Sequence, residues 1–183
     1  MSLAQDLSAG LARLGLLLSD AQQQLLLDYI ALLQKWNKVY NLTAVREPEN
    51  MLHQHLLDSL AVLPYVGTGR LLDVGTGGGL PGIALAIARP ELDITLLDSN
   101  QKKTTFLRQA CIELGLKNVK VECQRVENYK PSSSFDVVIS RAFSELSEFV
   151  RLSARLCRSG GKLLAMKGVY PHDELEKLPA QFR

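Results

Sequence analysis

The chain has 183 residues, the size of one compact domain, since single domains typically run to about 100–200 residues. Apolar residues make up 46% of the chain and charged residues 22%, values close to globular averages that exclude a disordered or fibrous protein. The formal net charge of +2 is too balanced for binding nucleic acid through bulk charge alone, so any polyanion has to meet a local cluster.

Residues 1–66 predict an all-helical segment that packs as a cap on the rest of the chain. Ser19 followed by Gln22 has the spacing of a capping box. Apolar side chains then recur every three or four residues, the period of an amphipathic helix whose apolar stripe faces a core. Pro48 suits the first turn of another helix. The predicted helices cover residues 3–14, 21–40 and 48–63.

Residues 67–183 alternate short apolar runs with helical stretches. This alternation predicts an α/β fold of the Rossmann-like type, a parallel sheet with helices on both faces. Right-handed crossovers place the carboxyl ends of the strands along one edge, where open sheets bind ligands. The predicted strands are 70–74, 92–98, 119–123, 135–140 and 162–166, and the predicted helices are 80–89, 100–114 and 145–158.

A glycine cluster follows the first predicted strand, in the run Asp73-Val-Gly-Thr-Gly-Gly-Gly-Leu-Pro-Gly82. Glycine lets the backbone turn tightly and approach a ligand, and the N-terminus of the next helix offers unpaired N–H groups. Two ligand classes use this arrangement. One is a dinucleotide, with its pyrophosphate on the helix N-terminus, and the other is a nucleoside sulfonium such as S-adenosylmethionine.

Two residues of this run favour the sulfonium. Pro81 removes an N–H donor that a pyrophosphate would need, and Asp73 would repel a pyrophosphate while suiting a ligand with an amino group and a sulfonium. The literal GxGxxG pattern from Gly77 to Gly82 keeps an NAD-dependent dehydrogenase as an alternative.

Three further signals lie at the ends of later strands. Asp98 ends the second strand, where it could accept both ribose hydroxyls of a nucleoside or, alternatively, cap the helix that starts near Asn100. The loop Gln124-Arg-Val-Glu127 is expected beside an adenine ring, with a solvated loop as the alternative. Arg141 places a cation at the mouth of the site, to hold a carboxylate or phosphate, unless it is an ordinary surface arginine.

These motifs occur together with Trp36-Asn-Lys-Val-Tyr-Asn-Leu-Thr43, His55-Leu-Leu-Asp-Ser59 and Met166-Lys-Gly168. The combination resembles the bacterial family called glucose-inhibited division protein B, over almost the whole chain. Members of that family are methyltransferases that modify a guanine of 16S rRNA at N7. The resemblance implies S-adenosylmethionine as cofactor, 16S rRNA or the small ribosomal subunit as partner, and a class I methyltransferase sheet. That class usually adds two strands after the last helix, and we expect this chain to stop before them.

The resemblance also assigns residues to the cofactor, position by position, and RNA candidates are sought among the basic and stacking groups near the strand ends. Arg141 is placed at the cofactor and is also an RNA candidate, whereas His55 and Asp58 could instead pair and hold the cap on the sheet. The implied cofactor contacts are Gly75, Gly77, Leu80, Asp98, Val126, Glu127 and Arg141. The RNA-binding candidates are Asn41, Arg46, His53, His55 and Lys167. No catalytic residue is assigned, because guanine N7 carries an exposed lone pair and no proton has to be removed. A binding module with a vestigial nucleotide site stays open as a further alternative.

The remaining signals concern compartment and metal. Cys111, Cys123 and Cys157 form no CxxC pair, so we expect no metal site, and their odd number fits a reducing compartment. No apolar run approaches the ~20 residues that cross a bilayer, and the N-terminus lacks the pattern of a secretory signal. We therefore expect a cytoplasmic monomer without a membrane partner.

Overall fold

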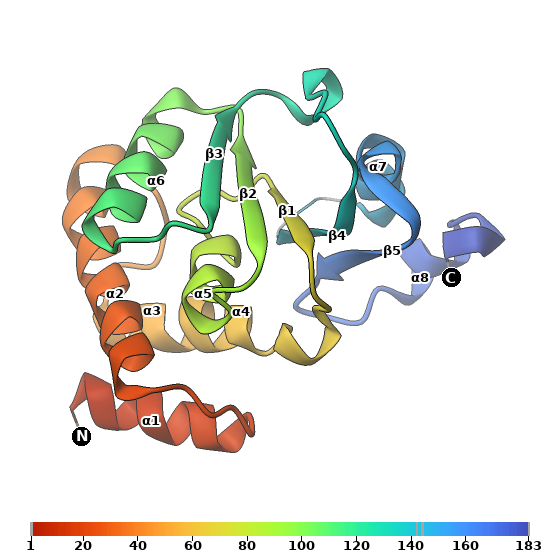
Figure 1. Cartoon of the computed structure of the whole chain (residues 1–183). Helices are drawn as coiled ribbons and strands as arrows, with labels where there is room; N and C mark the ends of the chain where they lie inside the picture. The colour runs from red at the N-terminus through yellow and green to blue at the C-terminus, as the bar shows by residue number, and fades with distance from the viewer. Residues whose placement is uncertain (1, 142, 144, 183) are drawn as a thin grey trace.

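The computed structural model describes residues 2–141, 143 and 145–182. Its centre is a sheet of five strands in the order β3-β2-β1-β4-β5 (Figure 1). All neighbouring strands run parallel, which confirms the predicted α/β fold. The strands are β1 (Arg70–Val74), β2 (Asp93–Asp98), β3 (Val119–Cys123), β4 (Phe135–Arg141) and β5 (Cys157–Met166).

The longer helices begin and end close to the predicted positions. At the start of the second helix, Ser19 Oγ accepts the Gln22 N–H and the Gln22 side chain accepts the Ser19 N–H, so the capping box is confirmed. No helix in the described ranges is long and apolar enough to cross a membrane. The helices are α1 (Leu3–Arg13), α2 (Asp20–Tyr40), α5 (Gly82–Ala88), α6 (Gln101–Glu113), α7 (Leu146–Ser153) and α8 (His172–Glu176).

The predicted helix over residues 48–63 is not regular. It consists of α3 (Pro48–Met51), a π-helical segment η1 (Leu52–Leu57) and α4 (Asp58–Leu60). The prediction of one α-helix is therefore wrong in its middle, because apolar spacing does not distinguish a π-helical turn from an α-helical one. Short π segments inside helices are frequent at functional sites, and this one contains the buried His55.

Helices cover both faces of the sheet, as predicted (Figure 1). Successive strand residues point to opposite faces, so Leu71 belongs to the larger core and Leu72 to the smaller one. The larger core joins the sheet to α1, α2, the helices of residues 48–60, α5 and α6. The smaller core packs Phe149 of α7 against Val138 and its neighbours. Leu26 and Leu33 of α2 are fully buried in the larger core, so the N-terminal helices share one core with the sheet.

The end of the sheet differs from the prediction. A helix was expected to reach residue 158, but α7 ends at Ser153, a short 3-10 turn η4 (Ala154–Leu156) follows, and β5 starts at Cys157. A register shift between Phe135 and Val137 lets this longer β5 pair with β4, and Gly160 there has a φ of 73°. The apolar pattern of residues 145–158 could not show this bulge. In the described sheet β5 is an edge strand.

Candidate functional site

The glycine cluster forms a tight turn between β1 and α5. Gly75, Gly77 and Gly79 all have positive φ angles of 68°, 59° and 97°, which residues with a Cβ adopt only with strain. The Gly75 N–H donates to the carbonyl of Leu97 at 2.8 Å, so the turn folds back over the end of β2. The backbone of the turn is therefore placed at the carboxyl edge of the sheet, as predicted from the motif.

Asp73 lies near the end of β1 and binds the glycine turn from within the protein. Its side chain is fully buried, and Oδ2 accepts hydrogen bonds from Thr76 Oγ1 at 2.7 Å and from the Gly82 N–H at 2.8 Å. Oδ1 is buried and has no hydrogen-bond partner among the described residues, so the expectation that this carboxylate favours a sulfonium stays a prediction. Through Oδ2, Asp73 ties the two ends of the glycine turn together.

Burial raises the pKa of Asp73 to about 6, above its ordinary value of 3.8. The folded chain therefore keeps a proton that the unfolded chain releases, and this group's contribution to stability is lost as the pH rises from 3.8 through about 6. Between pH 4 and pH 7 the natural chain should therefore lose ~2 kcal/mol of stability that Asp73→Asn, which cannot titrate, keeps. Urea denaturation at both pH values checks this, and an unchanged difference would contradict it.

The N-terminal segment supports the turn from outside. Tyr29 of α2 is fully buried, and its hydroxyl donates to the carbonyl of Gly78 at 2.6 Å. Leu33, one turn further along α2, packs directly on the Cα of Gly78. Sequence reasoning missed this role, although a tyrosine on a buried apolar stripe signals it, since a buried hydroxyl needs a partner.

A cavity of about 380 Å³ opens at the carboxyl ends of β1 and β2, a size within the ~300–1,000 Å³ typical of small-molecule sites. The structure brings four of the predicted cofactor residues together in its wall: Gly75, Asp98, Val126 and Glu127. Phe143, Leu152 and Lys103 also line it and were not predicted. The apolar side chains could contact a flat ring such as adenine, and the Asp98 carboxylate could accept hydroxyl groups.

Asp98 connects the glycine turn to the end of β2. Its side chain is 8% exposed, and its two oxygens accept the N–H groups of Gly77 at 2.9 Å and Asn100 at 2.8 Å. Each carboxylate oxygen keeps a further lone pair for a ribose hydroxyl. The alternative that Asp98 caps the next helix is wrong, because the side chain of Asn100 accepts the N–H groups of Lys102 and Lys103 and is the N-cap of α6.

The loop that carries Val126 and Glu127 is a short 3-10 turn, η3 (Val126–Asn128). Arg155 of η4 holds this turn in place, since its guanidinium donates to the carbonyls of Val126, Glu127 and Tyr129. Nothing in the sequence distinguished Arg155 from other arginines, because its partners lie 26 to 29 residues away. The predicted contacts of Val126 and Glu127 with adenine stay predictions.

Three of the seven predicted cofactor residues do not line the cavity. Gly77 borders it only through its hydrogen bond to Asp98, and Leu80 is 4% exposed within the larger core. Arg141 reaches toward the N-terminal helices, where its Nη1 donates to the carbonyl of Gln54 at 3.1 Å. The same nitrogen lies 3.4 Å from His55 Nδ1 and 3.6 Å from an oxygen of Asp58. His55 and Asp58 thus meet through Arg141 and hold the cap to the sheet.

The RNA-binding candidates divide into exposed and internal ones. Asn41, Arg46 and His53 are exposed, and Asn41 ends α2 in the left-handed conformation, with a φ of 50°. His55 is buried, as described above. Lys167 Nζ contacts both carboxylate oxygens of Glu174 at 3.0 Å and the carbonyl of Phe143, so it anchors α8. Its predicted RNA contact therefore receives no support from the described geometry.

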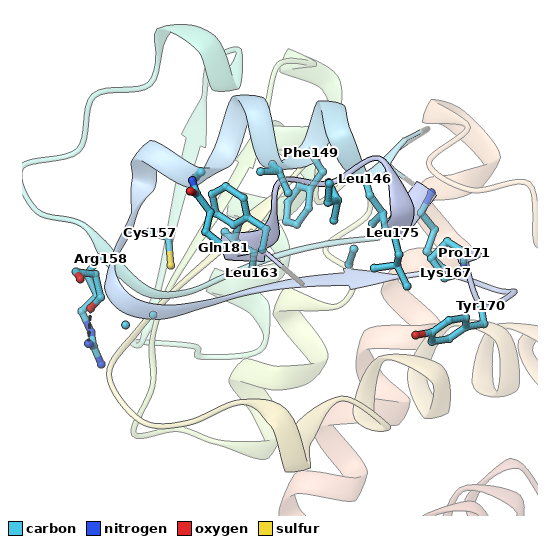
Figure 2. A pocket seen from close by; sticks show the side chains of 18 of the residues that line it. Leu146, Phe149, Cys157, Arg158, Leu163, Lys167, Tyr170, Pro171, Leu175 and Gln181 are labelled. Carbon is cyan, nitrogen blue, oxygen red and sulfur yellow. Dashed lines mark hydrogen bonds between the residues drawn. The ribbon is translucent and has the colours of Figure 1, made fainter. Parts of the chain in front are cut away.

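A larger cavity, of about 1020 Å³, lies elsewhere, along β5, α7 and α8. Figure 2 shows its mixed polar and apolar wall, with Phe149, Leu163 and Leu175 facing the space and Lys167 at one end. None of the seven predicted cofactor residues lines it. Size alone does not make it the cofactor site, because the glycine turn and Asp98 are at the other cavity.

A family model described as rRNA small subunit methyltransferase G matches residues 22–183. The chain belongs to this family. The resemblance to glucose-inhibited division protein B is thereby confirmed, and membership decides against the dehydrogenase alternative. A relative from Laribacter hongkongensis named ribosomal RNA small subunit methyltransferase G is 59% identical, covering 98% of this chain and 86% of its own. A relative of the same name from Nitrosospira multiformis is 55% identical, covering 100% and 88%.

Solved structures confirm the class I methyltransferase fold. A SAM-dependent methyltransferase from Geobacter sulfurreducens in complex with S-adenosyl-L-homocysteine matches with a TM-score of 0.52 and 20% identity, over 74% of this chain and 54% of that one. Coclaurine N-methyltransferase bound to N-methylheliamine and SAH matches with a TM-score of 0.55 and 13% identity, over 88% and 56%. At these identities the solved structures show only the fold. The evidence for methyltransferase activity is membership of the rRNA small subunit methyltransferase G family.

Proposed function

We propose that the protein transfers the methyl group of S-adenosylmethionine to N7 of a guanine in 16S rRNA, free or within the small ribosomal subunit. The observation that carries this proposal is the cavity joining Gly75, Asp98, Val126 and Glu127, in a chain of the rRNA small subunit methyltransferase G family. We take the enzyme to act as a monomer in the cytoplasm. Its three free cysteines agree with a reducing compartment.

The cavity fits an adenosine derivative. A Cβ placed on Gly75 would meet no atom within 4 Å, so open space lies against the backbone there and a ligand can fill it. Asp98 would hold the ribose hydroxyls, and Val126, Phe143 and Leu152 offer apolar surface to the adenine. The turn between Gly75 and Gly79 would take the methionine portion along its backbone.

S-adenosylmethionine supplies an electrophilic methyl group on a positively charged sulfur. Guanine N7 attacks with an exposed lone pair, so none of the chain's side chains has to remove a proton. The charge passes from sulfur to the guanine ring without net change, which leaves strong oxyanion-type stabilisation little to act on. The residues of the site therefore contribute by holding two reactants in line, an effect that can supply ~7–11 kcal/mol in favourable cases.

The absence of an acid or base from this mechanism has a kinetic consequence. We expect the single-turnover rate to show no bell-shaped dependence on pH, because no side chain has to change its protonation state. Rapid-quench measurement of methyl transfer at saturating S-adenosylmethionine checks this. A bell-shaped profile that disappears on replacing one side chain would contradict the proposed mechanism.

The function itself is tested with RNA that lacks the modification. Small ribosomal subunits and free 16S rRNA from cells without the gene are incubated with the protein and S-adenosylmethionine, then digested and examined by mass spectrometry. We expect one new 7-methylguanosine. Tight binding to the RNA without a new methyl group would favour the binding-module alternative, and a methyl group on another base would overturn the N7 assignment.

A further inference from the structure

A chain of polar contacts joins the loop after α2 to the carboxyl end of β4. Thr43 Oγ1 and His55 Nε2 lie 2.7 Å apart, and the other ring nitrogen of His55 lies 3.4 Å from Arg141 Nη1. Thr43, His55 and Arg141 come from three separate parts of the chain, the loop, the π-helical segment and the sheet. Thr43 and His55 lie outside the wall of the cofactor cavity.

The contact with Arg141 indicates a direction for each hydrogen bond. A guanidinium nitrogen only donates, so in this contact His55 Nδ1 accepts from Arg141 and the proton of the neutral ring sits on Nε2. Nε2 then donates to Thr43 Oγ1, which also accepts the Val45 N–H at 3.2 Å. Burial lowers the pKa of His55, which agrees with a neutral ring facing Arg141 from β4 and Asp58 from α4.

At one end, the connection fixes the shape of the loop. Besides the contact with His55, the Thr43 N–H donates to Asn37 Oδ1 at 2.9 Å, and Asn37 Nδ2 donates to the carbonyl of Val45 at 3.4 Å. The exposed Asn41 and Arg46, both candidates for RNA contact, flank this anchored segment. His55 therefore holds the part of the loop from which two RNA candidates project.

At the other end, the connection occupies one nitrogen of Arg141. Nη1 contacts the carbonyl of Gln54 as well as His55, and both partners belong to the π-helical segment. Among the described residues, Nε and Nη2 of Arg141 have no hydrogen-bond partner, so these donors are left for a ligand. The ring of His55 thus sets where the remaining donors of Arg141 lie.

We propose that His55 is a positioning residue that holds the loop of residues 41–47 and the Arg141 guanidinium in one fixed arrangement. This inference rests on the proposed function, since it links the side that receives RNA to the edge that holds the methyl donor. His55 touches neither substrate, and its ring acts through Thr43 on one side and Arg141 on the other.

Two substitutions of His55 separate the halves of the connection. In His55→Asn the side-chain oxygen takes the place of Nδ1 and still accepts from Arg141, while the contact with Thr43 is lost. In His55→Gln the side-chain nitrogen takes the place of Nε2 and still donates to Thr43, while the contact with Arg141 is lost. Thr43→Val removes the hydroxyl at nearly constant shape, and Thr43→Ser is its control because it keeps the hydroxyl.

We expect each lost hydrogen bond to change binding roughly fivefold to tenfold. Thr43→Val and His55→Asn should raise the KM for the small ribosomal subunit by this factor, with the Kd of S-adenosylmethionine within twofold of the natural value. Arg141 does not line the cavity, but the family resemblance places it at the cofactor, so His55→Gln should raise the Kd of S-adenosylmethionine. Thr43→Ser should restore the natural KM. Calorimetry gives the Kd, steady-state kinetics give KM and kcat, and Tm reports folding.

Three results would overturn the inference. One is an equal KM for Thr43→Val and Thr43→Ser, which tests the connection even if the buried His55 variants fail to fold. Another is Kd and KM values within twofold of natural in folded His55 variants. A third is a rise in Kd and KM together with a fall in Tm in all variants, which indicates a merely structural role. If the natural protein neither binds S-adenosylmethionine nor methylates the RNA, the proposed function fails instead.

Discussion

Replacing Asp98 with alanine is expected to weaken the binding of S-adenosylmethionine by at least about 100-fold, because hydrogen bonds to a charged group contribute ~1.5–3 kcal/mol each and two ribose hydroxyls would lose their acceptor. The change also removes the acceptor of the Gly77 N–H, which loosens the glycine turn on the ligand side. Isothermal titration with S-adenosylmethionine or S-adenosylhomocysteine measures the effect directly.

The same strand offers a matched control. Asp93 lies at the opposite end of β2, where it pairs with Arg70 on the surface, so Asp93→Ala should leave the affinity unchanged. A folded Asp98→Ala protein that binds within threefold of the natural affinity would contradict the assigned role. Unchanged affinity together with unchanged RNA modification would move the site away from this cavity.

The second large effect is expected for Gly82→Ala. A Cβ on Gly82 would collide with Leu96 of β2 and lie 2.8 Å from the Asp73 oxygen that binds the Gly82 N–H. Leu96 and Asp73 are fully buried, so neither side chain can move aside without disturbing the core. We expect a loss of ~1–3 kcal/mol or more in the free energy of unfolding, since overpacking is joined by a weakened hydrogen bond.

Gly67→Ala is the control for that substitution. A Cβ at Gly67 meets no atom within 4 Å, so a change of less than ~0.5 kcal/mol is expected there. Urea denaturation of both variants gives the comparison. Equal stability of the Gly82 and Gly67 variants would show that α5 does not need to pack so closely on β2, against the arrangement described here.

The parts of the fold that depend on neighbouring residues could be predicted from the sequence. The capping box of Ser19 and Gln22 is a contact across three positions. The run of glycines in the turn predicts positive φ angles there, because glycine adopts them without strain. Asp98 was predicted at the site because it ends a strand of a parallel sheet, where a carboxylate can accept the ribose hydroxyls of a nucleoside. Four of the seven cofactor residues meet in one cavity for the same reason.

The parts that failed depend on contacts between distant residues. The sequence did not show that Asp73 is fully buried, with Oδ2 bound to Thr76 and to the Gly82 N–H. The partners of Arg141 are 86 and 87 residues away, on a π-helical segment that no apolar period reveals. Arg155 likewise supports η3 through backbone carbonyls, which any sequence provides. Such roles arise only when the elements pack.

A crystal structure of the protein with bound S-adenosylhomocysteine tests the central claim most directly. The account predicts the adenosine in the cavity at the ends of β1 and β2, with both ribose hydroxyls within hydrogen-bond distance of Asp98 and the adenine beside Val126. An adenosine bound in the larger cavity along β5, or one whose ribose is held by other residues, would contradict it.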